Sequence, residues 1–279
     1  MDDAIRLPGL GPVIGGQVRY QLTLMLRTPR TLLAGLILPG ALLALQLGRV
    51  QHLGQGAAAG VLAARVAGLV VLGAMSVAYM SHASSLVVAR EDGVLRRWRA
   101  TPLPSWGYFA GRITATVLFA DAAALILVLV GVAMAGLHLT AAAVTGLLIA
   151  SSLGALALAA AGTAVTPLLT SAQGASPLLT LTFLPLVIFS GGFGGLSGLP
   201  QWVSTAMSYL PAQPMIGAVN HALLRSAGQS GLALPGRDLA VLAAWAAGGL
   251  LLSVRFFWWD PHRPRHARSA TAVNPARSG

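Results

Sequence analysis

The side chains of this 279-residue chain that could do chemistry gather in one short stretch, residues 90–104. Glu91 and Asp92 stand near its start, and Leu95 and Trp98 lie among the arginines that follow, Arg96, Arg97 and Arg99. Acids at the start and bases at the end of a segment stabilise a helix through its macrodipole. We therefore predict a short helix here, in which Leu95 and Trp98 share one face and which the prolines Pro102 and Pro104 end.

This predicted helix has two interpretations. An exposed aromatic and an exposed aliphatic side chain surrounded by charges form an outward apolar knob, which is typical of a docking element for a cytosolic protein. The alternative is a basic anchor on lipid headgroups, but an anchor gains nothing from Glu91 and Asp92. We take the docking residues to be Glu91, Asp92, Leu95, Arg96, Arg97, Trp98 and Arg99.

Two residue types often used in catalysis, Cys and Lys, are missing from the chain. It contains no Cys, and all 18 residues counted as Lys or Arg are Arg. The chain therefore lacks a thiolate, a Schiff-base amine and the lysine with which a P-loop binds ATP. His262 and His266 are four residues apart, but a tail rich in Pro and Arg makes a poor metal site. We expect no catalytic residue, no metal and no cofactor bound by this chain itself.

The composition places the chain in a lipid bilayer. Charged residues make up 9% and hydrophobic residues 56%, and the mean hydropathy is +0.75. Asp121 is the only formal charge between Arg112 and Arg225. A soluble fold needs far more charge on its surface, so the sequence excludes a soluble enzyme and a disordered chain. The net charge is +11, and the arginines that produce it lie at the edges of apolar runs. This placement suits lipid headgroups better than nucleic acid.

Apolar runs of spanning length predict an all-α integral membrane protein, because backbone in lipid must satisfy its own hydrogen bonds. We expect one transmembrane domain over residues 1–260 and a disordered basic tail over 261–279. The six predicted spans cover residues 31–47, 66–88, 113–135, 141–165, 177–193 and 239–259.

The arginines predict the orientation of these spans. Fourteen of the eighteen fall in the N-terminal segment, in the loop after the second span or in the C-terminal tail. Since positive charge marks the cytoplasmic side, we expect a multi-pass protein of the cell (plasma) membrane with N- and C-termini both cytoplasmic.

The segment before the first span predicts an interfacial helix. From Val18 to Arg27, apolar residues including Leu22 fall on one helical face, although an alternating strand pattern fits as well. A lone strand beside a membrane would leave its edges open, so we favour the helix. A simple basic anchor is the alternative. The residues assigned to this helix and its end are Arg19, Leu22, Arg27 and Arg30.

The segment between the fifth and sixth spans is too apolar for a free loop. Glycines around Phe193 end the fifth span, Pro200 and Trp202 predict the start of a short helix at headgroup level, and Pro211 and Pro214 predict its end. We expect short re-entrant or interfacial helices on the outer side.

Two polar residues fall inside predicted spans. Asp121 could meet a cationic substrate in a translocation path, pair with an arginine, or make a structural hydrogen bond. His82 could also lie on that path, and the simpler interpretation is a packed polar residue.

Three stretches together resemble one family. REDGVLRRWRATPLPSWGYFAGR is similar to the E-x-G-[TV]-L-R-R-x-R signature loop of ABC type-2 transporter permeases, the membrane subunits of drug and natural-product exporters. TPRTLLAGLILPGALLAL resembles the junction and first span of that family. FSGGFGGLSGLPQWVSTAMSYLPAQP resembles its outer motif, although this chain has Gly194 and Gly195 where the family often has Pro.

The resemblance implies a fold, partners and roles. It implies six helices per subunit, a second permease copy or paralogue, and two separate P-loop ATP-binding subunits that hold ATP and Mg. It makes the loop around Glu91 to Arg99 the coupling helix, the stretch from Val18 to Arg30 an interfacial connecting helix, and Pro200 to Pro214 outer gate helices. The substrate would be a small hydrophobic or amphipathic molecule such as a drug, an antibiotic or a lipid, so multidrug or antibiotic resistance is the expected setting.

Two other classes stay open on the residues alone. A secondary transporter or channel should carry ionisable residues in mid-membrane, and Asp121 is the only acid there. An intramembrane serine protease similar to rhomboids could use Ser197, in a Gly-Leu-Ser-Gly stretch, with His221 as its base. Such four-residue motifs arise often by chance in a chain this rich in glycine.

Overall fold

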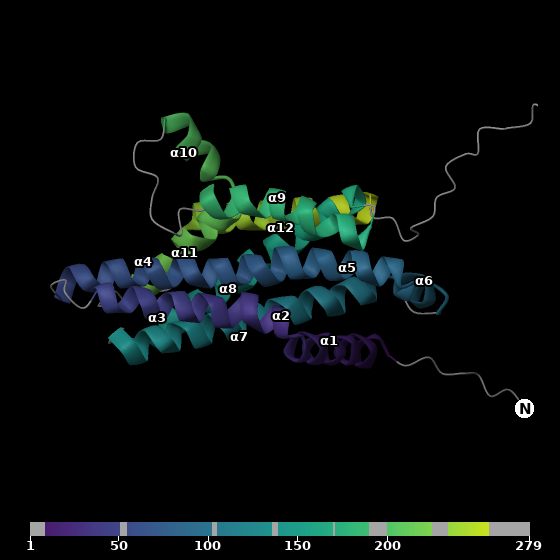
Figure 1. Ribbon diagram of the computed structural model, residues 1–279, viewed down its shortest axis with the longest axis horizontal. Coiled ribbons are helices and arrows are strands. Elements are labelled where there is room, and N and C mark those ends of the chain that lie inside the picture. Colours follow the sequence, from purple (N-terminus) through teal and green to yellow (C-terminus); the bar gives the residue numbers. More distant parts are fainter. Residues whose placement is uncertain are drawn as a thin grey trace, which may run out of the picture.

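The computed structural model describes residues 9–50, 55–101, 105–135, 139–169, 171–189, 200–224 and 234–256. Every regular element in these ranges is helical, so the predicted all-α fold is confirmed for the described part. The long helices lie side by side along the long axis of the molecule, and α9, α11 and α12 lie on one side of them (Figure 1).

The chain enters the bundle through a helix, a break and a second helix. Helix α1 (Leu10–Arg27) ends at Thr28, which is extended, and α2 (Pro29–Leu32) begins with proline at its first position. Proline is favoured there because its missing N–H has no helical partner to lose. The π-helical segment η1 (Leu33–Ile37) then leads into α3 (Leu38–Val50).

The second predicted span is longer in the structure than in the prediction. Helix α4 (Gln55–Ala74), the π-helical η2 (Met75–Ser81) and α5 (His82–Glu91) follow one another without a break. Short α6 (Val94–Arg99) and long α7 (Ser105–Ala135) follow. Helix α8 (Ala141–Val165) has the bounds predicted for the fourth span, and the hydroxyl of Thr140 accepts a hydrogen bond from the Ala143 amide at its start.

The last third of the chain folds into shorter helices. The 3₁₀ turn η3 (Thr166–Leu168) joins α8 to α9 (Ala172–Phe189), which contains Pro177 and Pro185. Helices α10 (Gln201–Met207) and α11 (Ala212–Leu224) precede α12 (Gly236–Phe256).

Four helical segments of the described part are long and apolar enough to cross a membrane: Pro29–Gln46, Gly60–Glu91, Trp106–Ala133 and Ala141–Leu168. They match the first four predicted spans. The described parts of the fifth and sixth predicted spans are helical, as α9 and α12. Helix α9 is a shorter apolar helix, and α12 is not among the four candidate segments. Six spans therefore stay a prediction.

Helix α8 lies at the centre of the bundle and is lined with small residues. It packs against α7, α11, α12 and η2, and its buried positions include Gly146, Ala150, Gly154 and Ala157. Small residues let helix backbones approach closely, which is how helices associate in a medium as apolar as their own side chains. Gly249 of α12 makes such an approach to Ala160 of α8.

The neighbouring glycines of α12 offer a matched test of this packing. A Cβ on Gly249 would lie 2.8 Å from the carbonyl carbon of Ala160, whereas a Cβ on Gly248 would meet open space. We expect Gly249→Val to lower the free energy of unfolding by about 1–3 kcal/mol, because backbone cannot yield to the added methyl groups. Gly248→Val should change it by less than about 0.5 kcal/mol. Thermal unfolding in detergent measures both, and equal losses would contradict the close approach.

Candidate functional site

The predicted docking loop folds into the end of α5, a tight turn and α6. Gly93 has a φ of 69°, a left-handed conformation that favours glycine, and its amide donates to the Arg90 carbonyl at 3.2 Å. This turn ends α5 at Glu91 and starts α6 at Val94. The prediction that Glu91 and Asp92 open the same helix as the arginines was therefore wrong, because the glycine divides the segment. Pro102 and Pro104 lie outside the described residues.

Arg90 joins the end of α5 to the end of α8. Its side chain is 6% exposed and donates to the carbonyl of Thr166 at 3.4 Å and to the carbonyl of Leu169. These carbonyls belong to η3 and the residue that follows it, and the Thr166 carbonyl also accepts from the Leu169 amide at 3.1 Å. A guanidinium at this position satisfies them and complements the negative end of the helix dipole.

Glu91 makes the opposite contact with the next helix. Its Oε1 accepts a hydrogen bond of 2.8 Å from the amide of Ala172, the first residue of α9. A carboxylate is favoured at a helix N-terminus, where free amides and the positive end of the dipole lie. The carboxylate is therefore bound within the chain, although Glu91 remains exposed. No local pattern in the sequence indicates that residue 172 lies beside residue 91.

The apolar face of α6 points into the protein. Leu95 is 0% exposed and forms a small cluster with Leu86 of α5 and Tyr108 of α7. Trp98 is half-buried, and its ring centroid lies 5.6 Å from that of Tyr108. The prediction of an outward knob was therefore wrong for Leu95. Burial against α5 and α7 removes that side chain from water, which stabilises a leucine by roughly 1.5–3 kcal/mol.

The outward side of this turn is charged. Asp92, Arg96 and Arg97 are exposed, and an Arg97 guanidinium nitrogen donates to the Asp92 carbonyl at 3.2 Å. The side chain of Arg99 lies outside the described residues. A partner that approaches α6 would thus meet arginines and a carboxylate rather than an apolar knob.

The N-terminal segment is helical, so the strand alternative for Val18 to Arg27 is wrong. Helix α1 packs along α7 near α6 (Figure 1). Leu22 is half-buried, whereas the three arginines assigned to this segment are exposed: Arg19, Arg27 and Arg30. Its placement in the membrane interface stays a prediction.

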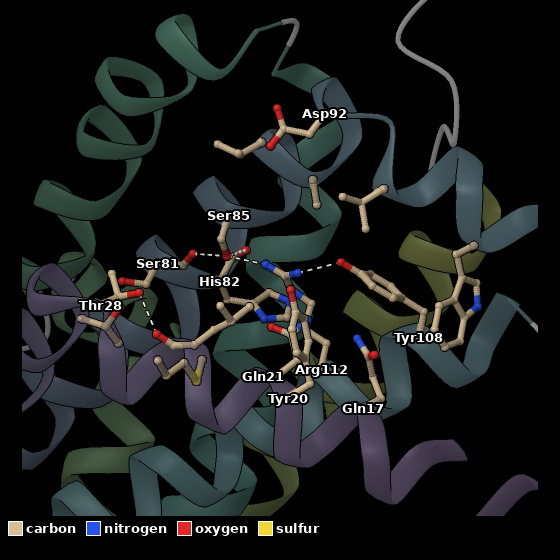
Figure 2. A pocket seen from close by; sticks show the side chains of 17 residues that line it. Gln17, Tyr20, Gln21, Thr28, Ser81, His82, Ser85, Asp92, Tyr108 and Arg112 are labelled. Atoms are coloured by element: carbon tan, nitrogen blue, oxygen red, sulfur yellow. Dashed lines mark hydrogen bonds between the residues drawn. The ribbon is translucent and has the colours of Figure 1, made fainter. Parts of the chain in front are cut away.

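A cavity of about 450 Å³ lies between α1, α5, α6 and α7. Figure 2 shows Gln17, Tyr20 and Gln21 on the α1 side, and Arg112 between Tyr108 and Ser85. Arg112 donates to the Tyr108 hydroxyl at 2.7 Å and to the Ser85 hydroxyl. Sequence reasoning placed Arg112 before the third span, but it lies inside α7. An arginine two turns inside an apolar helix is the signal that could have revealed this cavity.

His82 joins three helices at the base of the same region. It is 1% exposed, and its Nδ1 and Nε2 lie 3.2 Å and 3.0 Å from the hydroxyls of Thr116 on α7 and Thr163 on α8. A neutral imidazole has one N–H, so it donates to one of the two threonines. Both hydroxyls also donate within their own helices, Thr116 to the Arg112 carbonyl and Thr163 to the Ala159 carbonyl. The structure thus supports the packed polar interpretation, and a place on a translocation path stays a prediction.

Asp121 makes a hydrogen bond between helices. Its Oδ2 accepts from the Ser152 hydroxyl at 2.6 Å, which joins α7 to α8. Among the three roles considered for Asp121, the structural hydrogen bond is therefore present in the structure. A substrate contact stays a prediction.

The outer segment is partly described. Pro200 caps α10 and Trp202 is 74% exposed. Pro211 precedes α11, but Pro214 lies in its first turn, so the prediction that Pro214 ends a helix was wrong. A proline is tolerated there because the first amides of a helix have no helical acceptor. Phe193 and Ser197 lie outside the described residues, and His221 is half-buried in α11.

These features define a multi-pass helical membrane protein with a structured turn at one end of its bundle. The family described as ABC-2 type transporter matches residues 17–224. The chain therefore belongs to the ABC-2 type transporter family, as the three sequence motifs indicated. A comparison with curated proteins returned no match to the chain. Family membership makes it a transport permease, a subunit that is generally not catalytic by itself and that associates with an ABC ATP-binding subunit.

The hydrogen bonds of His82 can be tested with two threonines of α8. Thr163→Val removes a partner of the buried imidazole, whereas Thr145→Val removes an exposed hydroxyl that bonds only within its own helix. We expect the first change to lower the free energy of unfolding by about 1–3 kcal/mol, because it leaves a buried polar atom without a partner. The second should cost less than about 0.5 kcal/mol. Thermal unfolding in detergent compares them, and a Thr145→Val loss as large as that of Thr163→Val would refute the link.

Proposed function

We propose that this permease is the membrane subunit of an ATP-driven exporter that moves a hydrophobic or amphipathic small molecule, such as a drug, an antibiotic or a lipid-like compound, out of the cell. It works in the cell membrane with both termini in the cytoplasm. It pairs with a second copy or a paralogue, and two separate P-loop subunits bind ATP and Mg and dock on residues 90–104. The family assignment supports the transport role, and the missing lysine supports a separate ATPase.

One observation carries the coupling part of this proposal. The α5–α6 turn exposes charge on one side and is fixed on the other side to three different helices. Leu95 packs against Tyr108 of α7, Arg90 holds the end of α8, and Glu91 holds the start of α9. A push on α6 would therefore move the α8–α9 junction together with the start of α7, because packed and hydrogen-bonded groups move as one body.

The other classes have less support. A secondary transporter or channel should carry ionisable groups in mid-membrane, whereas Asp121 is the only acid in the predicted spans, and one of its two oxygens is bonded to Ser152. His221 lies in α11, and Ser197, the serine considered as a nucleophile, falls outside the described residues. No observation favours a protease.

The charged side of α6 predicts where the ATPase binds. Arg96→Gln with Arg97→Gln should weaken ATPase binding about tenfold, because removing two exposed cations slows association with an acidic surface. The matched control is Ala141→Glu with Ala142→Glu, which changes the net charge equally at exposed positions in the first turn of α8. Co-purification with the co-expressed ATPase and its stimulated ATP turnover measure the effect. Binding that is unchanged in the α6 variant would contradict docking at this turn.

The Glu91 contact predicts a different defect. Glu91→Ala should leave ATPase binding intact but reduce the transport obtained per ATP hydrolysed, because the amide of Ala172 loses its acceptor. Glu91→Gln retains an acceptor oxygen, so the transport obtained per ATP hydrolysed should lie between the values of the wild type and of Glu91→Ala. Transport and ATP turnover are measured together in proteoliposomes. A loss of ATPase binding in Glu91→Ala, with the ratio unchanged, would show that Glu91 docks the partner directly.

A further inference from the structure

The cavity between α1, α5, α6 and α7 contains a buried cation whose partners are all neutral. Arg112 is 5% exposed, and the two groups that accept its hydrogen bonds are the hydroxyls of Tyr108 and Ser85. Its Nε is buried without a hydrogen-bond partner. Within the described ranges, no carboxylate forms an ion pair with it, and the one acid on the cavity wall, Asp92, is exposed.

Such an arrangement favours an anionic ligand. Burying an ion without an opposite charge is costly, and an anion brought to it recovers much of that cost. A guanidinium is suited to phosphate or carboxylate because its N–H groups can bind two oxygens in parallel. Gln17 and Gln21 of α1 line the same cavity, so it also contains amide groups that can donate to an anion (Figure 2).

One part of the wall is apolar and partly exposed. Leu24 and Met25 of α1 and Val88 of α5 line the cavity, and Leu24 and Val88 are 42% and 43% exposed. Val88 lies in the segment Gly60–Glu91, which is long and apolar enough to cross a membrane, and an exposed apolar side chain in such a segment is favoured against lipid. The cavity thus combines a cationic base with an apolar mouth, which suits an amphiphile. Its volume of about 450 Å³ falls within the range of roughly 300–1,000 Å³ typical of ligand sites.

The position of Arg112 along α7 agrees with this chemistry. Helix α7 begins at Ser105, and seven residues of α-helix rise about 10 Å. The interfacial layer on each side of a bilayer is roughly 5–8 Å thick. An α7 that starts at the membrane surface therefore brings Arg112 to the depth where headgroups meet hydrocarbon.

We propose that this cavity binds an anionic amphiphile, with its phosphate or carboxylate on Arg112 and its apolar part between Leu24 and Val88. A phospholipid of the surrounding leaflet and a free fatty-acid-like molecule present the same chemistry. The proposal goes beyond the exporter function and does not rest on it, because binding requires neither ATP nor the ATPase subunit.

Native mass spectrometry of the full chain tests this binding. The protein is incubated with equal amounts of phosphatidylglycerol and phosphatidylcholine that carry identical acyl chains, and the retained ratio is measured. We expect preferential retention of phosphatidylglycerol, a fall of about tenfold in Arg112→Gln, and partial retention in Arg112→Lys. In a second arm, oleate is titrated against the bound phospholipid. Displacement by oleate identifies a site that also takes free amphiphiles, and its absence identifies a phospholipid site.

Two further variants separate this site from general attraction and from misfolding. Arg255→Gln removes one exposed arginine at the end of α12 and should leave the retained ratio unchanged. Val88→Trp narrows the mouth of the cavity at an exposed position and keeps Arg112. It should therefore reduce the retention of phosphatidylglycerol, and it serves as the test if Arg112→Gln unfolds. Equal retention in wild type, Arg112→Gln and Val88→Trp, or an equal loss in Arg255→Gln, would overturn the proposal.

Discussion

Two adjacent side chains of opposite charge hold the ends of two other helices, and the rest of the candidate site depends on them. Arg90 donates to carbonyls that close the α8–η3 segment, and Glu91 accepts from the amide that opens α9. Each charge meets the end of a helix dipole that it stabilises. The two contacts fix the end of α5 to the α8–α9 junction, so Gly93 turns the chain into α6 from a fixed base. Leu95 then packs against Leu86 and Tyr108.

Inside the bundle, the helices are joined by small residues and by neutral hydrogen bonds. Close contact along α8 depends on glycine and alanine, and the imidazole of His82 joins η2 and α5 to α7 and α8 through two threonines. Desolvating charged groups is expensive, whereas hydroxyl and imidazole groups lose less on leaving water. The arrangement gives the central helices definite contacts at modest cost. Charge is concentrated instead at the end of the bundle where α1, α6 and the cavity lie.

The sequence predicted the all-α fold and the first four spans, but it did not predict the break at Gly93 or the direction of side chains. Hydropathy located the first four spans because backbone in lipid must form its own hydrogen bonds, which leaves long apolar helices as the solution. The spacing of Leu95 and Trp98 showed a shared face, but spacing alone does not say whether that face meets a partner or the chain itself. The contact of Glu91 with Ala172 links residues far apart in sequence, so no local signal reveals it. Arg112 was counted with the loop because a hydropathy pattern places arginine at the edge of a span.

The two π-helical segments, η1 and η2, face each other, since a side chain on Gly35 would meet Val77. A π segment holds an extra residue within a continuous helix. If η2 became α-helical, the helix would wind one residue further before α5 begins. Helix α5 would then turn by roughly 100° about its axis, the angle of one residue in an α-helix. Such a rotation would carry Arg90 and Glu91 off the two helix ends and would turn Val88 away from the cavity mouth. The stored residue therefore links the packing of the first two spans to the register of the α5–α6 turn.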